Sequence, residues 1–514
     1  MEISLWIYLL VTLATLVYFY SKRKFSYWKD RNVVHIEPVF FYGNSKPVLR
    51  QKIHSSEVIG KLYNKVKSQG KRFGGHYTLF TPQFVPVDLD LIKCILHKDF
   101  AHFTNHGFYV NEEKDPLTGH LFNLEDEKWR NLRAKLTPTF TSGKMKMMFQ
   151  TMVSSSEGLQ EMLKTASLST EPVDIKDVLG CFTTDVIGSV AFGLDINSMK
   201  NPDSEFREYG KRIFKSTLLG RIKFILLTII PRWLFKKTGI KMFSRDMESF
   251  FINLVKKTVA YREENNVYRK DFMHLLIQLK NMGKVSEDNE DQLIQKNKNN
   301  IQGLSINEMA AQSFVFFLAG FETSATTMSF ALLELAQNEE LQNKVRDEIN
   351  RVLAKHDNKV TYESIMDMEY LEKVVLESLR KHPPIGVLPR ICTKNYQVPD
   401  SDLVITVGTR LNIPVLSIHR DPDYYPDPEK FDPERFNDEN KAKRHPFSYL
   451  PFGEGPRTCI GLRFGKLQSK VGLCHVLRNY KVTLNEKTQF PIKYESSFIS
   501  SVKDGIWLNL EPVS

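Results

Sequence analysis

The chain places one of its five cysteines in a distinctive loop: Phe452-Gly453-Glu454-Gly455-Pro456-Arg457-Thr458-Cys459-Ile460-Gly461. Glycine tolerates tight turns and allows another group to approach the backbone closely. An isolated cysteine is most often a buried structural thiol, and the other four have no comparable neighbours. The loop therefore marks Cys459 as the candidate for chemistry.

Length and composition describe an ordinary globular protein with a basic surface. Of 514 residues, 42% are hydrophobic and 25% are charged, which excludes wholesale disorder, a collagen-like repeat and a membrane protein with many spans. Lysine and arginine number 71 against 60 acidic residues, a net charge of +11. Such a balance suits nucleic acid, an anionic membrane surface or an acidic protein. Because no nucleic-acid-binding motif is present, we expect the last two. An odd number of irregularly spaced cysteines favours a reducing compartment.

The amino terminus has the composition of a membrane anchor. Residues 3–20 are apolar or aromatic apart from three hydroxyl side chains, and as a helix they would span about 27 Å. Three cations follow at 22–24, which argues against the alternative of a cleaved signal peptide and places the next residues on the cytoplasmic side. We expect an anchor over 1–24, a hinge over 25–50 and a catalytic domain over 51–514.

The rest of the chain is predicted to be mainly α with a small β portion. Helical periodicity runs from about residue 125 to 380, whereas strand-like runs are confined to 76–80, 403–411 and 493–510. The polar stretch 284–303 is predicted to be a solvated loop.

One buried helix with an unusual centre is predicted to begin at Ser305. Ser305 and Glu308 have the spacing of a capping box, and the following residues are apolar almost all round, as in a helix buried on every side. A glycine, an acid and two hydroxyl residues interrupt it at 320–324. Glycine inside a helix costs about 1 kcal/mol relative to alanine, and hydroxyls compete for backbone carbonyls. This segment alone allows either a functional site or a tolerated irregularity of the core.

The loop around Cys459 resembles the heme-binding loop of the cytochrome P-450 superfamily, F-x-x-G-x-R-x-C-x-G, at all five fixed positions. The resemblance extends over essentially everything after the anchor and implies the fold of that superfamily. It also implies that Cys459 is the thiolate ligand of a heme iron, with Phe452 beside the cofactor and Arg457 paired with a propionate.

A second element of the superfamily, E-x-x-R, occurs at Glu377 and Arg380, on one face of a helix that ends before two prolines. In the family, an arginine of a later P-E-R-F segment joins this pair, and Arg435 holds that position here. The resemblance implies a structural network of the three that stabilises the fold around the heme loop. The other E-x-x-R pairs, at 127–130 and 348–351, are expected on solvated helix faces.

The long helix matches the family's oxygen-binding groove, Ala-Gly-x-Glu-Thr. The resemblance implies that Gly320 leaves room for dioxygen and that Glu322 and Thr323 form an acid–alcohol pair that delivers protons to it. Further contacts with the heme propionates are implied, against the alternative of an ordinary surface or core role, for three residues: Trp129, Arg133 and Arg390.

Finer features resemble the insect microsomal branch that metabolises xenobiotics, in segments 135–144, 271–273 and 317–323. The implied reaction is monooxygenation of a lipophilic substrate such as a plant toxin or insecticide. Because the chain has no dinucleotide-binding fingerprint, the resemblance implies an NADPH-cytochrome reductase as electron donor, with cytochrome b5 as an optional second donor, at the endoplasmic reticulum membrane. The alternatives are a heme-thiolate isomerase or dehydratase, against which the acid–alcohol pair argues, and a non-enzymatic heme sensor.

Substrate contacts and a second membrane contact are also expected. The candidate substrate segments are 102–124, 206–225, 242–255, 314–323 and 385–388. The aromatic candidates, for which core packing is an equal explanation, are Phe103, Phe108, Tyr109, Phe122 and Phe214. The apolar run 224–230, followed by Trp233 and several cations, is typical of an interfacial membrane segment, with an internal packing helix as the alternative.

Overall fold

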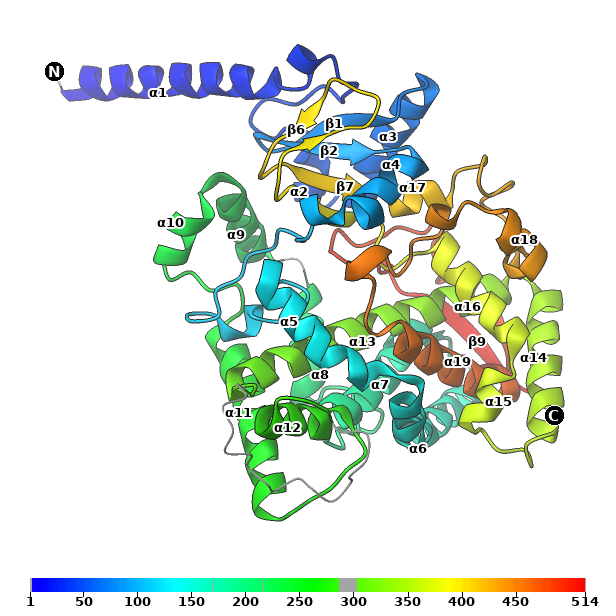
Figure 1. Ribbon diagram of the computed structural model, residues 1–514. Helices are drawn as coiled ribbons and strands as arrows, with labels where there is room; N and C mark the ends of the chain where they lie inside the picture. Colours follow the sequence, from blue (N-terminus) through cyan, green and yellow to red (C-terminus); the bar gives the residue numbers. More distant parts are fainter. Residues whose placement is uncertain (1, 170, 216, 286–302, 514) are drawn as a thin grey trace.

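The computed structural model describes residues 2–169, 171–215, 217–285 and 303–513, and it confirms a mainly α fold with three small sheets (Figure 1). The predicted loop 284–303 lies almost wholly outside the described residues. The α-helices are α1 Glu2–Phe25, α2 Lys46–Leu49, α3 Ser55–Ser68, α4 Leu89–Lys93, α5 Asp126–Leu136, α6 Ser142–Leu168, α7 Ile175–Ile187, α8 Glu205–Phe214, α9 Leu218–Ile229, α10 Arg232–Lys237, α11 Arg245–Glu264, α12 Phe272–Met282, α13 Ile306–Ala336, α14 Glu339–Ala354, α15 Tyr362–Met366, α16 Glu369–Lys381, α17 Val415–His419, α18 Asp438–Lys443 and α19 Leu462–Asn479. The strands are β1 Phe73–Thr78, β2 Thr81–Pro86, β3 Val173–Asp174, β4 Leu388–Ile391, β5 Tyr396–Gln397, β6 Val404–Ile405, β7 Arg410–Ile413, β8 Tyr480–Leu484 and β9 Trp507–Pro512.

The predicted buried helix is α13, which crosses the helical part of the molecule and packs against α7, α11, α16 and α19 (Figure 1). Its capping box is confirmed, since the Ser305 hydroxyl accepts the Glu308 amide at 3.2 Å and the Glu308 carboxylate accepts the Ser305 amide at 2.8 Å. Among the described residues, α13 is also the one helix long and apolar enough to cross a membrane, but 78% of that window is buried inside the protein. It is therefore the central core helix.

The largest sheet has the strand order β1-β2-β7-β4, in which β2 and β7 are parallel and the other pairs are antiparallel. The strand predictions were wrong in detail. The run 76–80 covers only the end of β1 and its turn, 403–411 is divided between β6 and β7, and 493–510 contains only the start of β9. Strands β2, β3, β4, β5 and β8 were not predicted. Strands this short depend on partners distant in the sequence, which local alternation does not reveal.

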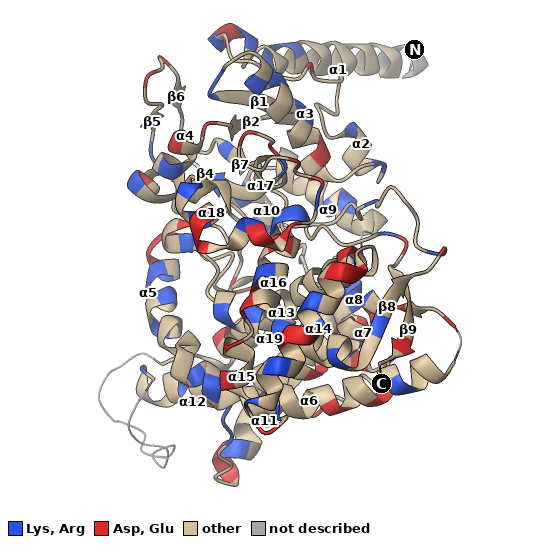
Figure 2. Ribbon diagram, turned by 90° about the vertical axis from the view of Figure 1, so that its right-hand side faces the viewer, with Lys and Arg blue, Asp and Glu red and all other residues tan. Residues whose placement is uncertain are grey.

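The amino-terminal helix α1 projects from the body of the protein (Figure 1), and its apolar side chains between Trp6 and Tyr20 are mostly exposed. Basic residues gather where α1 meets the body (Figure 2). The next segment, 25–50, packs on the sheet through Trp28, whose indole nitrogen donates to the His76 carbonyl at 3.1 Å. The expected anchor thus forms one exposed apolar helix, and the expected hinge contacts β1.

Candidate active site

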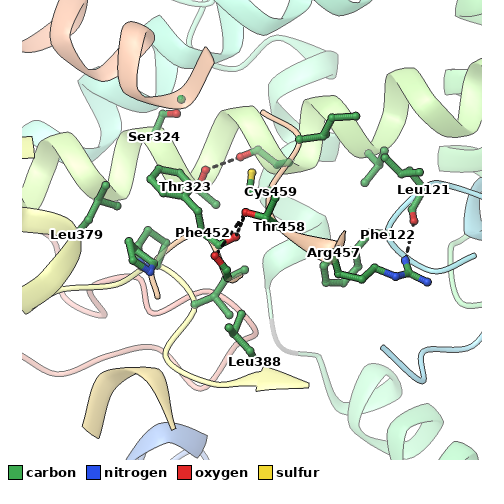
Figure 3. Close-up of a pocket in the computed structure, with 18 of the residues that line it drawn as sticks. Leu121, Phe122, Thr323, Ser324, Leu379, Leu388, Phe452, Arg457, Thr458 and Cys459 are labelled. Atoms are coloured by element: carbon green, nitrogen blue, oxygen red, sulfur yellow. Dashed lines mark hydrogen bonds between the residues drawn. The ribbon is translucent and has the colours of Figure 1, made fainter. Parts of the chain in front are cut away.

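A cavity lies between α13 and the loop that carries Cys459 (Figure 3). The volume of the cavity that is open to the centres of water molecules is about 220 Å³. By the same measure one buried water needs only about 10–15 Å³, so the cavity is much larger than a single water site. Cys459 and Phe452 line it from the loop, and Ala319 and Thr323 line it from α13. Apolar side chains form much of the remaining wall: Leu121, Phe122, Val315, Phe316, Val375, Leu379, Pro384, Ile385 and Leu388.

The loop holds Cys459 by backbone hydrogen bonds. The Cys459 amide donates to the Phe452 carbonyl at 2.8 Å, and the Gly461 amide donates to the sulfur. Gly455 has φ +74°, and a side chain there would overlap the Leu96 carbonyl, so this turn requires glycine. The Cys459 side chain is exposed toward the cavity. Desolvation by the surrounding protein raises the pKa of its thiol, while the Gly461 amide and the Arg133 charge act against that rise. The loop thus presents a fixed sulfur whose thiolate form has donors already in place.

Three arginines make one end of the cavity cationic. The Arg457 guanidinium donates to the carbonyls of Thr104 and Leu124 at 2.8 and 2.7 Å and lies 3.9 Å from the centre of the Trp129 ring. Burial, reinforced by the charge of Arg390, lowers the pKa of Arg457 to about 9. Burial likewise lowers the pKa of Arg390, to about 10. It also lowers the pKa of Arg133.

None of these three arginines forms an ion pair with an acidic side chain among the described residues, although the charges of Glu125 and Asp126 act on Arg457. Among the described residues that line the cavity there is no aspartate or glutamate, and the buried Arg390 Nε has no hydrogen-bond partner among the described atoms. Buried cations of this kind need an anionic partner. An apolar slot with a thiol beside it and arginines at one end fits a heme, whose propionates would meet Arg390, Arg457 and Arg133.

The structure separates the three residues expected to handle oxygen and protons. Thr323 lines the cavity, and its hydroxyl donates to the Ala319 carbonyl at 2.5 Å. Glu322 is buried and instead pairs with Lys176 of α7 at 3.1 Å. Gly320, expected to leave room for dioxygen, instead faces α7, where a side chain would come within 2.8 Å of Ile187. Neither Glu322 nor Gly320 is among the described residues lining the cavity, because α13 turns them toward α7.

The structure brings Glu377, Arg380 and Arg435 together beneath the loop. The Arg380 guanidinium donates to both Glu377 oxygens at 2.7 and 2.8 Å, and both side chains are fully buried. Arg435 lies 3.5 Å from the same carboxylate, which also accepts the Asp432 amide at 2.9 Å. Burial raises the pKa of Glu377, and Arg380 opposes that rise. The network joins α16 to the segment that precedes the cysteine loop.

The expected substrate segments contribute unequally. Segments 102–124, 314–323 and 385–388 supply cavity residues, whereas 206–225 and 242–255 supply none among the described lining residues. Of the five aromatic candidates, Phe122 alone is among those lining residues. Phe108 packs on Phe122 with ring centres 5.4 Å apart.

Sequence reasoning missed His106, which lines the cavity. Its Nδ1 lies 2.8 Å from the Phe122 carbonyl, and its ring centre lies 4.3 Å from that of Phe122. Burial, together with Arg390 and Arg457, holds the pKa of His106 well below its usual range. No motif marked this residue, since its place depends on the folding of the 102–124 segment.

Comparison with known proteins agrees with the geometry. The family model described as Cytochrome P450 matches residues 38–508. Probable cytochrome P450 6a23 of Drosophila melanogaster is 43% identical over 99% of this chain and 100% of its own. Cytochrome P450 6A1 of Musca domestica is 42% identical over 99% of this chain and 98% of its own. These insect relatives confirm the resemblance, and the chain belongs to the cytochrome P450 family of heme-dependent monooxygenases.

Proposed function

We propose that this protein is a membrane-bound monooxygenase that inserts one atom of dioxygen into neutral, lipophilic small molecules, including xenobiotics such as plant toxins and insecticides. The observation that carries the proposal is the composition of one cavity, in which the Cys459 thiol and the Thr323 hydroxyl lie among mostly apolar and aromatic side chains. The cations Arg133, Arg390 and Arg457 belong to its propionate end. The remaining lining is predominantly apolar and aromatic, and its further cation, Lys466, is paired with Glu372. Such a wall favours uncharged molecules.

Cys459 would bind the iron and Phe452 would cover the cofactor beside it. Trp129 and the three arginines would hold the propionates. A bound heme supplies an iron whose thiolate ligand favours cleavage of the O–O bond. The protein holds the cofactor, excludes water by its apolar walls and supplies protons.

We propose that Thr323 and Glu322 supply protons from two different sides of α13. Thr323 holds a hydroxyl on the cavity wall, within reach of an oxygen bound there. Glu322 lies on the α7 side of α13 beside Lys176, so it would exchange this partner before it passes a proton toward Thr323. Burial raises the pKa of Glu495, and the charges of Lys176 and Glu322 act on its carboxylate. Glu495 thus extends this polar group away from the cavity.

Electrons are proposed to come from an NADPH-cytochrome reductase, with cytochrome b5 as an optional second donor, at the cytoplasmic face of the endoplasmic reticulum. The net charge of +11 suits an acidic partner. Exposed cations near the cysteine loop, Arg130 on α5 and Arg463 on α19, offer such a partner a place to dock close to the heme.

A cysteine substitution tests the proposal. Cys459→Ala should abolish the strongly red-shifted Soret band that the reduced carbon monoxide complex of a thiolate-bound heme shows. Cys94→Ala, away from the cavity, is the control and should retain it. Wild-type protein with reductase should consume NADPH when a lipophilic substrate is added. Retention of the band by Cys459→Ala would contradict the ligand assignment, and turnover of a peroxide without NADPH would favour an isomerase or dehydratase. Heme binding without any turnover would favour a sensor.

A further inference from the structure

A buried histidine, His419 at the end of α17, joins the E-x-x-R helix to the cysteine loop. Its Nδ1 lies 3.0 Å from the Arg380 carbonyl, and its Nε2 lies 2.8 Å from the Leu450 amide nitrogen. A carbonyl can only accept and a backbone amide can only donate, so Nδ1 carries the hydrogen and Nε2 accepts. Both ring nitrogens therefore have defined and different roles.

The surroundings hold this ring neutral and in place. Burial, reinforced by the charge of Arg380, lowers the pKa of His419 to about 3. Arg380 also donates to the His419 carbonyl at 2.9 Å, so the two residues bind each other in both directions. The ring stacks on Tyr449 with centres 5.5 Å apart and planes 17° apart, and the Tyr449 hydroxyl donates to the Leu376 carbonyl of α16 at 2.9 Å.

Two backbone hydrogen bonds connect the segment that begins at Leu450 with Cys459. The Leu450 carbonyl accepts the Gly453 amide at 3.0 Å, and the Phe452 carbonyl accepts the Cys459 amide at 2.8 Å. Leu450 thus begins the turn 450–453, and Phe452 within that turn is bonded to the backbone of Cys459. The amide of Leu450 is buried, and His419 is the partner that satisfies it.

We propose that His419 is a positioning residue for the cysteine ligand: its Nε2 fixes the Leu450 amide, and with it the start of the loop that presents Cys459 to the heme. This inference rests on the proposed heme-thiolate site. Without that acceptor, the Leu450 amide would be buried and unpaired. The loop could then shift, and the sulfur would leave the iron more readily.

Two isosteric substitutions separate this role from simple packing. In His419→Gln, the side-chain amide reaches the position of Nε2, so its oxygen can still accept the Leu450 amide. In His419→Asn, the shorter amide reaches only the position of Nδ1 and leaves Leu450 without an acceptor. The control is His475→Asn in α19, a buried histidine whose nitrogens contact Ser156 and Gln160 instead of the loop.

The measurement is the rate at which the reduced carbon monoxide complex of each holoenzyme loses its thiolate-type Soret band in mild denaturant. The His419→Asn variant should lose it roughly tenfold faster than wild type, which corresponds to about 1.4 kcal/mol. The Gln variant and the His475 control should stay within about threefold of wild type. A purely structural role would not produce rescue by glutamine.

Equal rates for the Asn and Gln variants, or a wild-type rate for Asn, would overturn the inference. If the Asn variant does not fold, hydrogen exchange of wild-type holoenzyme decides: the Leu450 amide should exchange as slowly as the buried amides of α16, and rapid exchange would refute the bridge. Absence of the thiolate band in wild type would instead refute the proposed function itself.

Discussion

Thr323 is the one member of the expected acid–alcohol pair whose side chain the structure places on the cavity wall. Thr323→Ala should leave heme incorporation intact but uncouple the enzyme, because electrons would still reach oxygen while protons arrive without control. Product formed per NADPH should fall roughly tenfold or more, and peroxide should rise. Thr326→Ala is the matched control, since Thr326 lies on α13, is buried and is not among the described residues lining the cavity. An unchanged ratio of product to NADPH in Thr323→Ala would refute the relay role.

Arg380 belongs to a buried ion pair in which both partners are fully covered. Removal of one member of such a pair strands the other charge and costs roughly 3–5 kcal/mol. Arg380→Leu should therefore yield protein with little or no heme, measured as the ratio of heme absorbance to protein. Arg351→Leu offers a control in the same E-x-x-R spacing, because Arg351 is largely exposed and lies 4.0 Å from Glu348. Normal heme content in Arg380→Leu would count against the network.

The packing of α7 against α13 determines the role of Gly320. Gly320 permits the close approach of Ile187 from α7, so Gly320→Val should overpack this contact and cost about 1–3 kcal/mol in unfolding free energy. In the Ile187→Ala background, the same Gly320→Val change should cost much less unfolding free energy, measured by chemical denaturation. An equal cost of Gly320→Val with and without Ile187→Ala would contradict the packing assignment.

Helix α16 depends on a residue that was expected to be solvated. Glu348 of α14 is buried, and its carboxylate accepts the amides of Tyr370 and Leu371 at 2.8 Å each. Free amides at the start of a helix favour such an acceptor. The E-x-x-R spacing at 348–351 therefore belongs to a cap between helices, and the expectation of a solvated pair was wrong for Glu348.

At the scale of the whole molecule, exposed apolar side chains on α1, α9 and α10 support the proposed contact with a membrane. Helices α1, α9 and α10 all extend to the left of the body in Figure 1, and Leu218 and Trp233 are 66% and 64% exposed. Leu227 and Ile230, expected to be immersed, are only partly exposed. The exposed face of α9 and α10, with the cations Lys236 and Lys237 nearby, is what an interfacial segment needs.

A liposome assay tests this second contact. Protein lacking residues 1–24 should still bind anionic liposomes at low salt, and replacement of Leu218, Leu219 and Trp233 by polar residues should weaken that binding roughly tenfold. The control replaces Leu168 and Tyr261, which are also exposed but lie on other helices. Absence of liposome affinity in the truncated protein would leave α1 as the sole membrane attachment.

The sequence by itself determined the features that depend on local or short-range chemistry. Three such features are the glycine-rich loop around Cys459, the capping box at Ser305 and the E-x-x-R pair at Glu377 and Arg380. Each depends only on residues close together in the sequence, because backbone turns, helix caps and helix faces are local. The mainly α class followed from the same periodicities.

Only the tertiary structure decided which way each side chain of α13 points and which distant residues meet. Thr323 and Glu322 are adjacent in the sequence, yet one faces the cavity and the other faces Lys176, because successive residues of a helix point about 100° apart. The roles of His106, Glu348 and His419 depend on partners far along the chain. The sequence around each of these residues therefore does not indicate its role. The short strands could not be predicted for the same reason.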